Sequence, residues 1–456
     1  MMKQIIRLSP LAAALLLVSC SPQSQTTAPD VRLKWNQATL KGDYERVGRR
    51  NAKWDQAAGE ALAEFARVRS RYSSDQNEQL EDIGRLAAEA VEAGCDDPML
   101  RYLYCRFAPQ VSRMPVPTLQ NEVRRMAGNL EGSGYSPLRK FYANIRASNV
   151  LWQNRDTNLW NEVCTFRMTA MNDLGAALRD KNLPIEEVGQ AGQFLIDSTA
   201  STQFMLTNAY NTIATPLFQN WPHAAVSFSI RGKFYYEWAW KGRGNGYANE
   251  VTPEGWKLFS DRLAEAEKAL NQAWNLNPGD EQAPTLMISV VECQQKKRDE
   301  METWFDRAMN LNTNNYKACG KKLHYLYPQW YGSREEMLEF GRQCVQSTLW
   351  GDDVPLILVD AHLQCAHRLP SSEQDDYWRQ PEVWPDIKAA YDKFFQLNPQ
   401  AAHVRNYYAW YAGACEQWQA FNEQIALLKE VDFGVFDGKA EYDKLVARAR
   451  AAQTNP

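Results

Sequence analysis

The sequence AEKALNQAWNLNP at residues 266–278 has two counterparts further along the chain, METWFDRAMNLNT at 301–313 and IKAAYDKFFQLNP at 387–399. All three segments carry apolar residues at the first and fifth positions, a small or apolar residue at the eighth, and Leu-Asn at the eleventh and twelfth. Spacings of three and four residues place these side chains on one face of an α-helix. The segments therefore predict helices of similar length that bury the same face.

The same helical periodicity runs through most of the chain, and no stretch alternates apolar and polar residues for long. Two helix starts are marked, since Thr252 precedes Pro253 and Ser333 stands three residues before Glu336. The chain is therefore predicted to be all-α. The clearest predicted helices are residues 77–93, 254–276, 301–311 and 335–346.

The eighth positions of the first two segments, Ala273 and Ala308, are 35 residues apart. This spacing, with a small residue in the helix and a proline after it, resembles the second half of the tetratricopeptide (TPR) repeat, whose period is about 34 residues. The first half of the TPR pattern is matched only loosely, by Gly232-x2-Tyr235 and Ala409-x2-Ala412. The resemblance implies a TPR-like array of helical hairpins, an α-solenoid with degenerate repeats, over residues 225–450. Residues 31–224 are predicted to be helical but outside this register.

The middle of the chain also resembles a group of bacterial proteins that share a domain of unknown function. Four segments carry the resemblance: Gly94-Cys95-Asp96-Asp97-Pro98, Trp238-Ala239-Trp240-x2-Arg243-Gly244-x-Gly246-Tyr247-Ala248, Met301-Glu302-x-Trp304-Phe305-x-Arg307-Ala308-Met309 and Trp330-Tyr331-Gly332-Ser333-x-Glu335-Glu336-Met337. The group brings no established reaction or catalytic residue. This resemblance supports the helical fold and leaves the function open.

The first residues predict a cleaved targeting segment. Lys3 and Arg7 precede an apolar run at 11–18, which is too short for the roughly 20 residues that a membrane-spanning helix needs. The run ends in Leu17-Val18-Ser19-Cys20, which resembles the lipobox of bacterial lipoproteins. The resemblance implies a signal peptide at 1–19, lipidation of Cys20 and a flexible tether over 20–30. Ser21 after the cysteine implies sorting to the outer membrane, with the protein facing the periplasm.

Composition narrows the classes of partner and site. The chain of 456 residues has 51 basic and 55 acidic side chains, and this balance argues against nucleic-acid binding. No polybasic patch is present, so membrane attachment is predicted through the N-terminal lipid only. Without Cys20 there are eight cysteines, which leaves disulfides open. The pairs Cys95/Cys105 and Cys344/Cys365 are the first candidates because each joins neighbouring predicted helices.

Motifs for catalysis, metals or cofactors are weak, so we predict no catalytic residue, no metal and no cofactor. The glycines of residues 242–246 follow a helix-like stretch and lack the Lys-Ser/Thr ending of a phosphate loop. His362 and His367 are five residues apart, whereas two metal ligands on one helix face need three or four. Asp360 and His362 are two apart on a predicted helix, where their side chains diverge.

Most of the sixteen tryptophans are expected in helix–helix contacts, as for Trp256, Trp274 and Trp304. The candidates for an exposed binding surface lie in predicted connections: Trp240, Tyr247, Trp330 and Tyr331.

The connection after Trp240 also looks too long for a TPR hairpin. Gly232 and Ala266 occupy positions that are 12 residues apart in a TPR repeat but 34 apart here, which implies an insertion of about 22 residues. Arg243 in this insertion offers a planar donor fork for a ligand or partner. The alternative is a loop that packs on the next repeat, with Arg243 bonded to helix carbonyls.

Two function classes follow from the sequence. The first is an envelope lipoprotein whose helical repeats form a scaffold or binding module for an unidentified envelope protein or peptide. The second is a cell-envelope glycan-binding protein or enzyme that uses exposed aromatic residues. A pair of carboxylates converging beside Trp240 or Trp330 would favour the second class.

Overall fold

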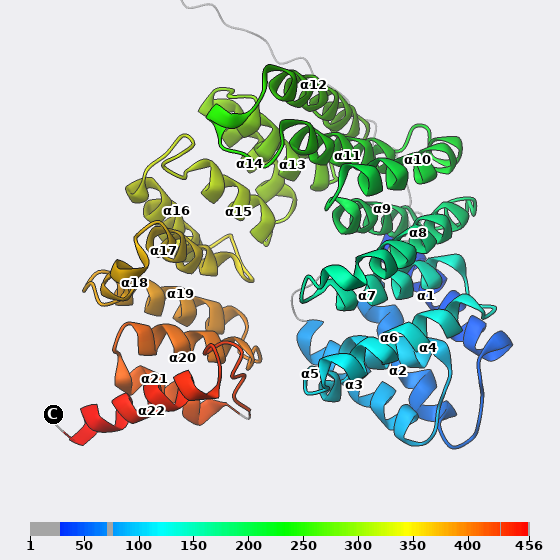
Figure 1. Ribbon diagram of the computed structural model, residues 1–456, viewed down its shortest axis with the longest axis horizontal. Coiled ribbons are helices and arrows are strands. Elements are labelled where there is room, and N and C mark those ends of the chain that lie inside the picture. Colours follow the sequence, from blue (N-terminus) through cyan, green and yellow to red (C-terminus); the bar gives the residue numbers. More distant parts are fainter. Residues whose placement is uncertain (1–27, 71–75, 429, 455–456) are drawn as a thin grey trace, which may run out of the picture.

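The computed structural model describes residues 28–70, 76–428 and 430–454 (Figure 1). The predicted signal peptide, Cys20 and most of the tether therefore lie outside the described residues. The N-terminal part of the described chain contains ten α-helices and one short 3-10 helix. They are α1 (Ala28–Val47), α2 (Asp55–Ser70), α3 (Gln76–Glu92), α4 (Pro98–Phe107), α5 (Pro109–Ser112), α6 (Val116–Glu131), α7 (Pro137–Trp152), η1 (Thr157–Leu159), α8 (Trp160–Ala177), α9 (Ile185–Thr199) and α10 (Gln203–Asn220).

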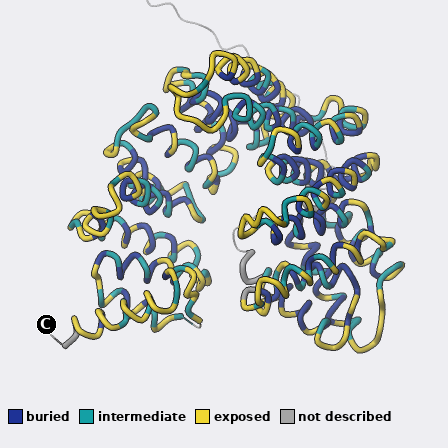
Figure 2. The backbone as a smooth tube through the Cα atoms, viewed as in Figure 1, coloured by how far each residue is buried: buried dark blue, intermediate teal, exposed yellow. Residues whose placement is uncertain are grey.

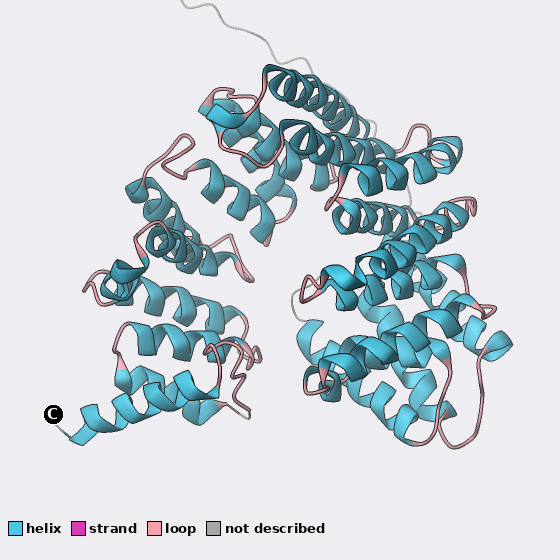
Figure 3. Ribbon diagram, viewed as in Figure 1, coloured by secondary structure: helices cyan, strands magenta, loops and turns pink. Residues whose placement is uncertain are grey.

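The second part of the chain contains the predicted repeats. Its elements are α11 (Ala225–Arg243), η2 (Ala248–Glu250), α12 (Pro253–Leu276), α13 (Gln282–Cys293), α14 (Arg298–Leu311), α15 (Tyr316–Tyr325), α16 (Arg334–Gln346), η3 (Val354–Leu356), α17 (Ile357–His367), α18 (Ser371–Trp378), α19 (Val383–Leu397), α20 (Val404–Ala414), α21 (Trp418–Leu427) and α22 (Lys439–Thr454). Figure 3 shows helices and loops and no strand in the described part, so the prediction of an all-α fold is confirmed.

The helices follow one another along an arch, in which each packs mainly against its neighbours in sequence (Figure 1). The arch curves so far that its two ends face each other. There the guanidinium of Arg113, just after α5, forms an ion pair with Glu430, between α21 and α22. This pair joins residues 317 positions apart in the sequence.

The repeat pattern is visible in how three helices end. The segments 266–278, 301–313 and 387–399 cover the C-terminal part of α12 and most of α14 and α19, and each ends two residues beyond its helix. In each, the backbone N–H of the asparagine at the twelfth position donates to the carbonyl four residues earlier, from Asn277 to Ala273, Asn312 to Ala308 and Asn398 to Phe394. The side chains at the first, fifth and eighth positions are all buried. The predicted TPR-like hairpin array is therefore confirmed.

One repeat was missed in the sequence. α15 and α16 form a further hairpin in which Cys344, 36 residues after Ala308, is fully buried. Gly341 lies at the close approach to α17, because a Cβ atom there would be 2.7 Å from the Cα of Leu358. The next repeat contains the extra helix α18, so the spacing from Cys344 to Phe394 rises to 50 residues. This repeat was not recognised in the sequence because Gly341 and Cys344 stand at its contact positions and because α18 interrupts the spacing to the next repeat.

The predicted insertion after Trp240 is mostly helix. α11 extends to Arg243 and α12 begins at Pro253, so the extra residues lengthen both helices and leave only residues 244–252 between them. Gly232 does pack against the turn of helix α12 that begins at Ala266, since a Cβ atom on Gly232 would lie 2.6 Å from Leu270 Cγ and 3.3 Å from the Ala266 carbonyl oxygen. The predicted pairing is therefore correct and the expectation of a long loop was wrong. Trp240 lies on α11 rather than in a connection.

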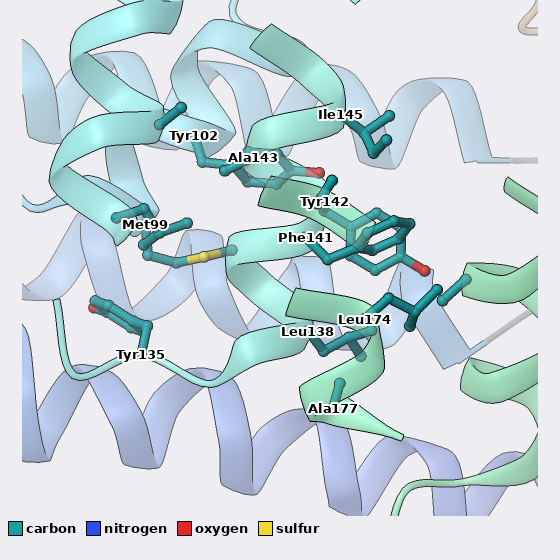
Figure 4. Close-up of a cluster of buried hydrophobic side chains, with 14 of the residues drawn as sticks. Met99, Tyr102, Tyr135, Leu138, Phe141, Tyr142, Ala143, Ile145, Leu174 and Ala177 are labelled. Atoms are coloured by element: carbon teal, nitrogen blue, oxygen red, sulfur yellow. The ribbon is translucent and has the colours of Figure 1, made fainter. Parts of the chain in front are cut away.

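Buried residues line the helix contacts all along the arch instead of gathering at one centre (Figure 2). One apolar cluster runs from Leu40 to Phe234 and a second from Ala225 to Cys415, and both include residues of α11. Figure 4 shows part of the first cluster, where Phe141 and Tyr142 of α7 lie beside Leu174 of α8. The ring centroids of Phe141 and Tyr142 are 4.9 Å apart.

Trp256 is less buried than expected, and the structure answers the question of disulfides that the sequence left open. Trp304 is buried, but Trp256 is 37% exposed, and its ring contacts Phe259 of α12 and Arg243 of α11. The eight cysteines of the described chain are free thiols, including the candidate pairs Cys95/Cys105 and Cys344/Cys365. Burial is the first cause that raises the pKa of Cys95 and of Cys105 to about 11, so both thiols stay protonated at neutral pH.

The repeat register makes a stability prediction. Ala308 is fully buried between paired helices, so Ala308→Trp is expected to lower the free energy of unfolding by roughly 1–3 kcal/mol through overpacking. Lys257 is the control, because its side chain is 76% exposed on α12 and Lys257→Ala should change stability by less than about 0.5 kcal/mol. Thermal melts of both variants test this, and equal melting temperatures would contradict the register.

Candidate functional site

Three consecutive hairpins place their turns at one edge of the array. α13 and α15 run side by side in the same direction, because Asn315 and Thr285 meet near their starts, with Nδ2 and Oγ1 2.8 Å apart. His324 and Glu292 meet at their ends, with Nδ1 and Oε1 2.7 Å apart. α11 packs beside α13 and ends at the same edge. All five predicted binding residues lie in or next to the turns at this edge: Trp240, Arg243, Tyr247, Trp330 and Tyr331.

Arg243, the last residue of α11, is held between two tryptophans. Its guanidinium carbon lies 5.5 Å from the ring centroid of Trp240 and 5.2 Å from that of Trp256, which permits cation–π contact with both. Its Nη1 donates to the carbonyl oxygens of Gly246 at 2.9 Å and Gly244 at 3.3 Å. The sequence alternative had placed Arg243 on helix carbonyls, whereas the structure places it on carbonyls of its own loop. The side chain of Arg243 is half-buried.

Tyr247 is displayed by this ordered turn. Gly244 has a φ of +83°, which favours glycine and lets the chain reverse after α11. The backbone N–H of Tyr247 donates to Glu250 Oε2 at 2.7 Å, which fixes the short helix η2 behind it. The tyrosine side chain itself is 82% exposed, the largest exposure among the large hydrophobic residues of the described chain. An exposed aromatic ring on a rigid turn is well suited to contact a partner.

Trp330 and Tyr331 lie in the turn after α15, as the sequence predicted. The Tyr331 hydroxyl donates to the backbone carbonyl of Glu292 at 3.0 Å, and its ring stacks on Tyr325 with centroids 4.7 Å apart. Trp330 is half-buried, and its ring lies 5.8 Å from that of His324. The two aromatic residues are therefore fixed to the end of α13.

The end of α13 connects the two groups of candidates. Cys293 packs with Tyr236 and Trp240 of α11 around the buried Phe259 of α12. The neighbouring Glu292, only 3% exposed, contacts His324 with its carboxylate and Tyr331 with its carbonyl. Burial raises the pKa of Cys293 to about 12, so it acts as an apolar residue here. We call Trp240, Arg243, Tyr247, Trp330, Tyr331, Glu292 and His324 the turn-edge patch.

The sequence interpretation missed Glu292 and His324. The available signal was that Glu292 is the one charged residue in the otherwise uncharged helix α13, QAPTLMISVVEC. A lone charge in such a helix predicts a buried polar contact. His324 lies on another helix, and its pairing with Glu292 required the register of α15 on α13.

A second polar group lies between α11, α13 and α15, one to two turns from the patch. Lys321 Nζ donates to Ser289 Oγ at 2.8 Å, and burial lowers the pKa of this lysine. A serine paired with a lysine can act as a nucleophile in hydrolases. Ser289, however, lies within α13, whose N–H groups bond along the helix and do not face the hydroxyl. The pair is therefore better suited to joining two helices than to stabilising an oxyanion.

The remaining sequence candidates have structural partners. Asp360 accepts a hydrogen bond from the Tyr316 hydroxyl, whereas His362 is 1% exposed and bonds to Tyr377 at 2.8 Å and Asp386 at 3.1 Å. Asp360 and His362 thus diverge, as predicted. Within residues 28–70, 76–428 and 430–454, no three His, Cys, Asp or Glu side chains gather in a way that could hold a metal ion.

The helices of the described chain also include none with the length and apolarity needed to cross a bilayer. Comparison with known proteins adds no relative. The chain matches no protein-family model, and a search of curated proteins finds no similar sequence.

Proposed function

We propose that this chain is an outer-membrane lipoprotein of the bacterial envelope whose helical array binds a protein or peptide partner at the turn-edge patch. The observation that carries the proposal is that residues from the turns after α11 and α15, and from the end of α13 between them, lie on one edge of the array. Repeat arrays commonly bind partners with surfaces that several repeats build together. Tryptophan, tyrosine and arginine are also the residue types that contribute most to binding at protein interfaces.

The contacts around the tryptophans favour binding over glycan hydrolysis. Retaining and inverting glycosidases use two carboxylates that flank the scissile bond. Trp240 contacts Arg243 and Phe259, and Trp330 contacts His324, whose described carboxylate partner is Glu292. One carboxylate bonded to a histidine differs from a converging pair. These contacts support the scaffold and binding function rather than the enzyme.

The patch is tested by the double variant Arg243→Ala/Tyr247→Ala. We expect it to keep its melting temperature within a few degrees and its membrane attachment, but to lose the protein that crosslinks to the wild type in its own envelope. The reason is that Tyr247 is exposed, and that Arg243, half-buried beside Trp240 and Trp256, bonds to carbonyls of its own loop. The measurement is crosslinking and co-purification of the full-length chain.

The matched control is Arg85→Ala/Tyr407→Ala, which removes an exposed arginine on α3 and a tyrosine on α20 that is 51% exposed. This control should retain the partner. If the patch variant melts much earlier than the control, or if both retain the same partner, the turn-edge patch is a structural feature and the proposal fails.

Attachment through Cys20 is a separate prediction. Cys20→Ala is expected to abolish lipidation and to release the chain from membranes, because attachment would depend on the acyl chains alone. Metabolic labelling with palmitate and membrane fractionation measure this. Absence of label in the wild type would contradict the assignment as a lipoprotein, whatever happens to partner binding.

A further inference from the structure

The Gly94–Pro98 motif forms one wall of a cleft that the turn-edge patch does not include. The cleft measures about 140 Å³ and lies between the chain after α1, the start of α4 and the middle of α6. Its charged lining consists of three arginines and two carboxylates: Arg49, Arg101, Arg125, Asp96 and Glu122. Since α4 and α6 pack against each other, these side chains project from a rigid framework.

Asp97 of this motif fixes the backbone of the cleft. It is fully buried and accepts hydrogen bonds from the N–H groups of Met99 and Leu100 at the start of α4. Its second oxygen accepts the backbone N–H of Arg49 at 2.9 Å. The Arg49 carbonyl in turn accepts the indole N–H of Trp54 at 2.9 Å. Arg49 is therefore held at the mouth of the cleft by its main chain.

Two of the arginines are oriented by neighbouring carboxylates. Arg49 Nη1 pairs with Asp96, and Arg125 Nη2 lies 2.7 and 2.8 Å from the two oxygens of Glu122. Each pair uses one nitrogen of a guanidinium that carries five N–H donors, so further donors remain. A carboxylate that orients an arginine in this way prepares it for a second, planar contact.

Arg101 differs from the other two. It lines the same cleft from α4, and no described carboxylate forms an ion pair with it. The positive charges of Arg101 and Arg125 both act to lower the pKa of Cys105, although the effect of burial, which raises this pKa, is larger. The three arginines and two carboxylates leave the cleft with one net positive charge.

We propose that Arg49, Arg101 and Arg125 form a binding site for a phosphoryl group, carried either by a small phosphorylated solute or by a lipid headgroup. Guanidinium groups that approach from α4, α6 and the chain after α1 can each donate to a different oxygen of a tetrahedral oxyanion, whereas a carboxylate offers only two oxygens. The volume of about 140 Å³ is room for one phosphoryl group. The site is independent of the partner proposed above.

The test uses the full chain with Cys20→Ala, so that no acyl group contributes to membrane binding. Calorimetric titration with inorganic phosphate at low ionic strength should show binding that Arg101→Gln weakens about tenfold or more, the range expected for one lost charge-assisted contact. Arg85→Gln is the control, because it removes an exposed arginine of α3 and should leave binding unchanged. Arg125→Gln is a second test variant, and thermal melts of all variants confirm folding.

Sedimentation with vesicles identifies the source of the phosphoryl group. If phosphatidylglycerol vesicles but not phosphatidylcholine vesicles bind the chain, and Arg101→Gln abolishes this, the ligand is a headgroup. If inorganic phosphate binds through Arg101 and neither vesicle does, the ligand is a small solute. If neither probe binds, or if binding is the same in folded Arg101→Gln and Arg125→Gln chains, the site is refuted.

Discussion

Replacement of Glu187 by alanine is expected to lower the free energy of unfolding of the N-terminal helices by about 3–5 kcal/mol, the usual cost of removing one member of a buried ion cluster. Glu187 on α9 is fully buried. Its carboxylate accepts Arg32 Nε of α1 at 2.9 Å and also pairs with Arg69 of α2. Arg139 of α7 reaches the same group through Asn36, which donates to Glu187 at 3.0 Å.

The variant would leave three buried guanidinium groups without this carboxylate. The pKa of Glu187 shows how strongly they act. Burial alone would raise this pKa, but the charges of Arg69, Arg32 and Arg139 lower it to about 2. Because the pKa is lowered in the folded chain, the stabilisation is complete above the ordinary pKa near 4.5 and is lost as the pH falls from there towards 2.

Native-state hydrogen exchange is the suitable measurement, since the hairpins of a repeat array can unfold separately. Protection should fall in α1, α2, α7 and α9 and stay unchanged in α19 to α21. The control is Glu186→Ala, the preceding residue on α9, which forms no ion pair with any other described residue and should change protection by less than about 1 kcal/mol. Equal losses in both variants would show that the helix end, and not the arginine cluster, is responsible.

The repeat helices were predictable because their contacts are local. Ala273 and Ala308 recur at one spacing, and each packs on helices adjacent in the chain, so the sequence contains both the pattern and its period. The helix at 335–346 was predicted, but its place in the repeat register was missed, because Gly341 and Cys344 meet the packing requirement without the alanine or phenylalanine that marks the other repeats. The packing requirement is for small volume, which several residue types meet.

The ionic contacts of the N-terminal region could not be predicted in the same way. Arg32 and Glu187 are separated by 155 positions, and neither has a local motif that marks it as buried. The turn-edge patch was partly predictable, in contrast to the local repeat contacts and to the long-range ionic contacts. Its aromatic residues were found because they flank predicted turns, whereas Glu292 and His324 meet only once α15 is placed on α13. Residue type and position near predicted turns were therefore sufficient to name the candidate binding residues. The residues that they contact could be identified only from the folded structure.

A second buried carboxyl group gives a prediction of opposite sign. Asp173 on α8 is 7% exposed and accepts Asn144 Nδ2 at 2.8 Å, while the same amide nitrogen donates to Glu131 at 3.1 Å. Burial, and then the charge of Glu131, raises the pKa of Asp173 to about 7. Here the neighbour is another carboxylate instead of a group of arginines. The charged form of Asp173 is therefore unfavourable in the folded chain.

Because this pKa is raised, the folded chain holds a proton that the unfolded chain releases between about pH 4 and 7. The wild type is thus expected to lose stability as the pH rises through this range, by up to about 4 kcal/mol for a shift of about three units. Asp173→Asn keeps the shape without the charge, so it should remove this slope and be the more stable chain at pH 8. Hydrogen exchange of α7 and α8 between pH 5 and 8, corrected for intrinsic rates, measures the effect.

Two further variants separate burial from the neighbouring charge. Glu131→Gln removes the repulsion but leaves Asp173 buried. Since removal of a like charge can only lower this pKa, we expect the shift to lower pH, with a slope that remains because burial is the larger cause. Asp306→Asn, an exposed site on α14, is the control and should leave the profile of the wild type unchanged. A wild-type slope that persists in Asp173→Asn would assign the pH dependence to another group.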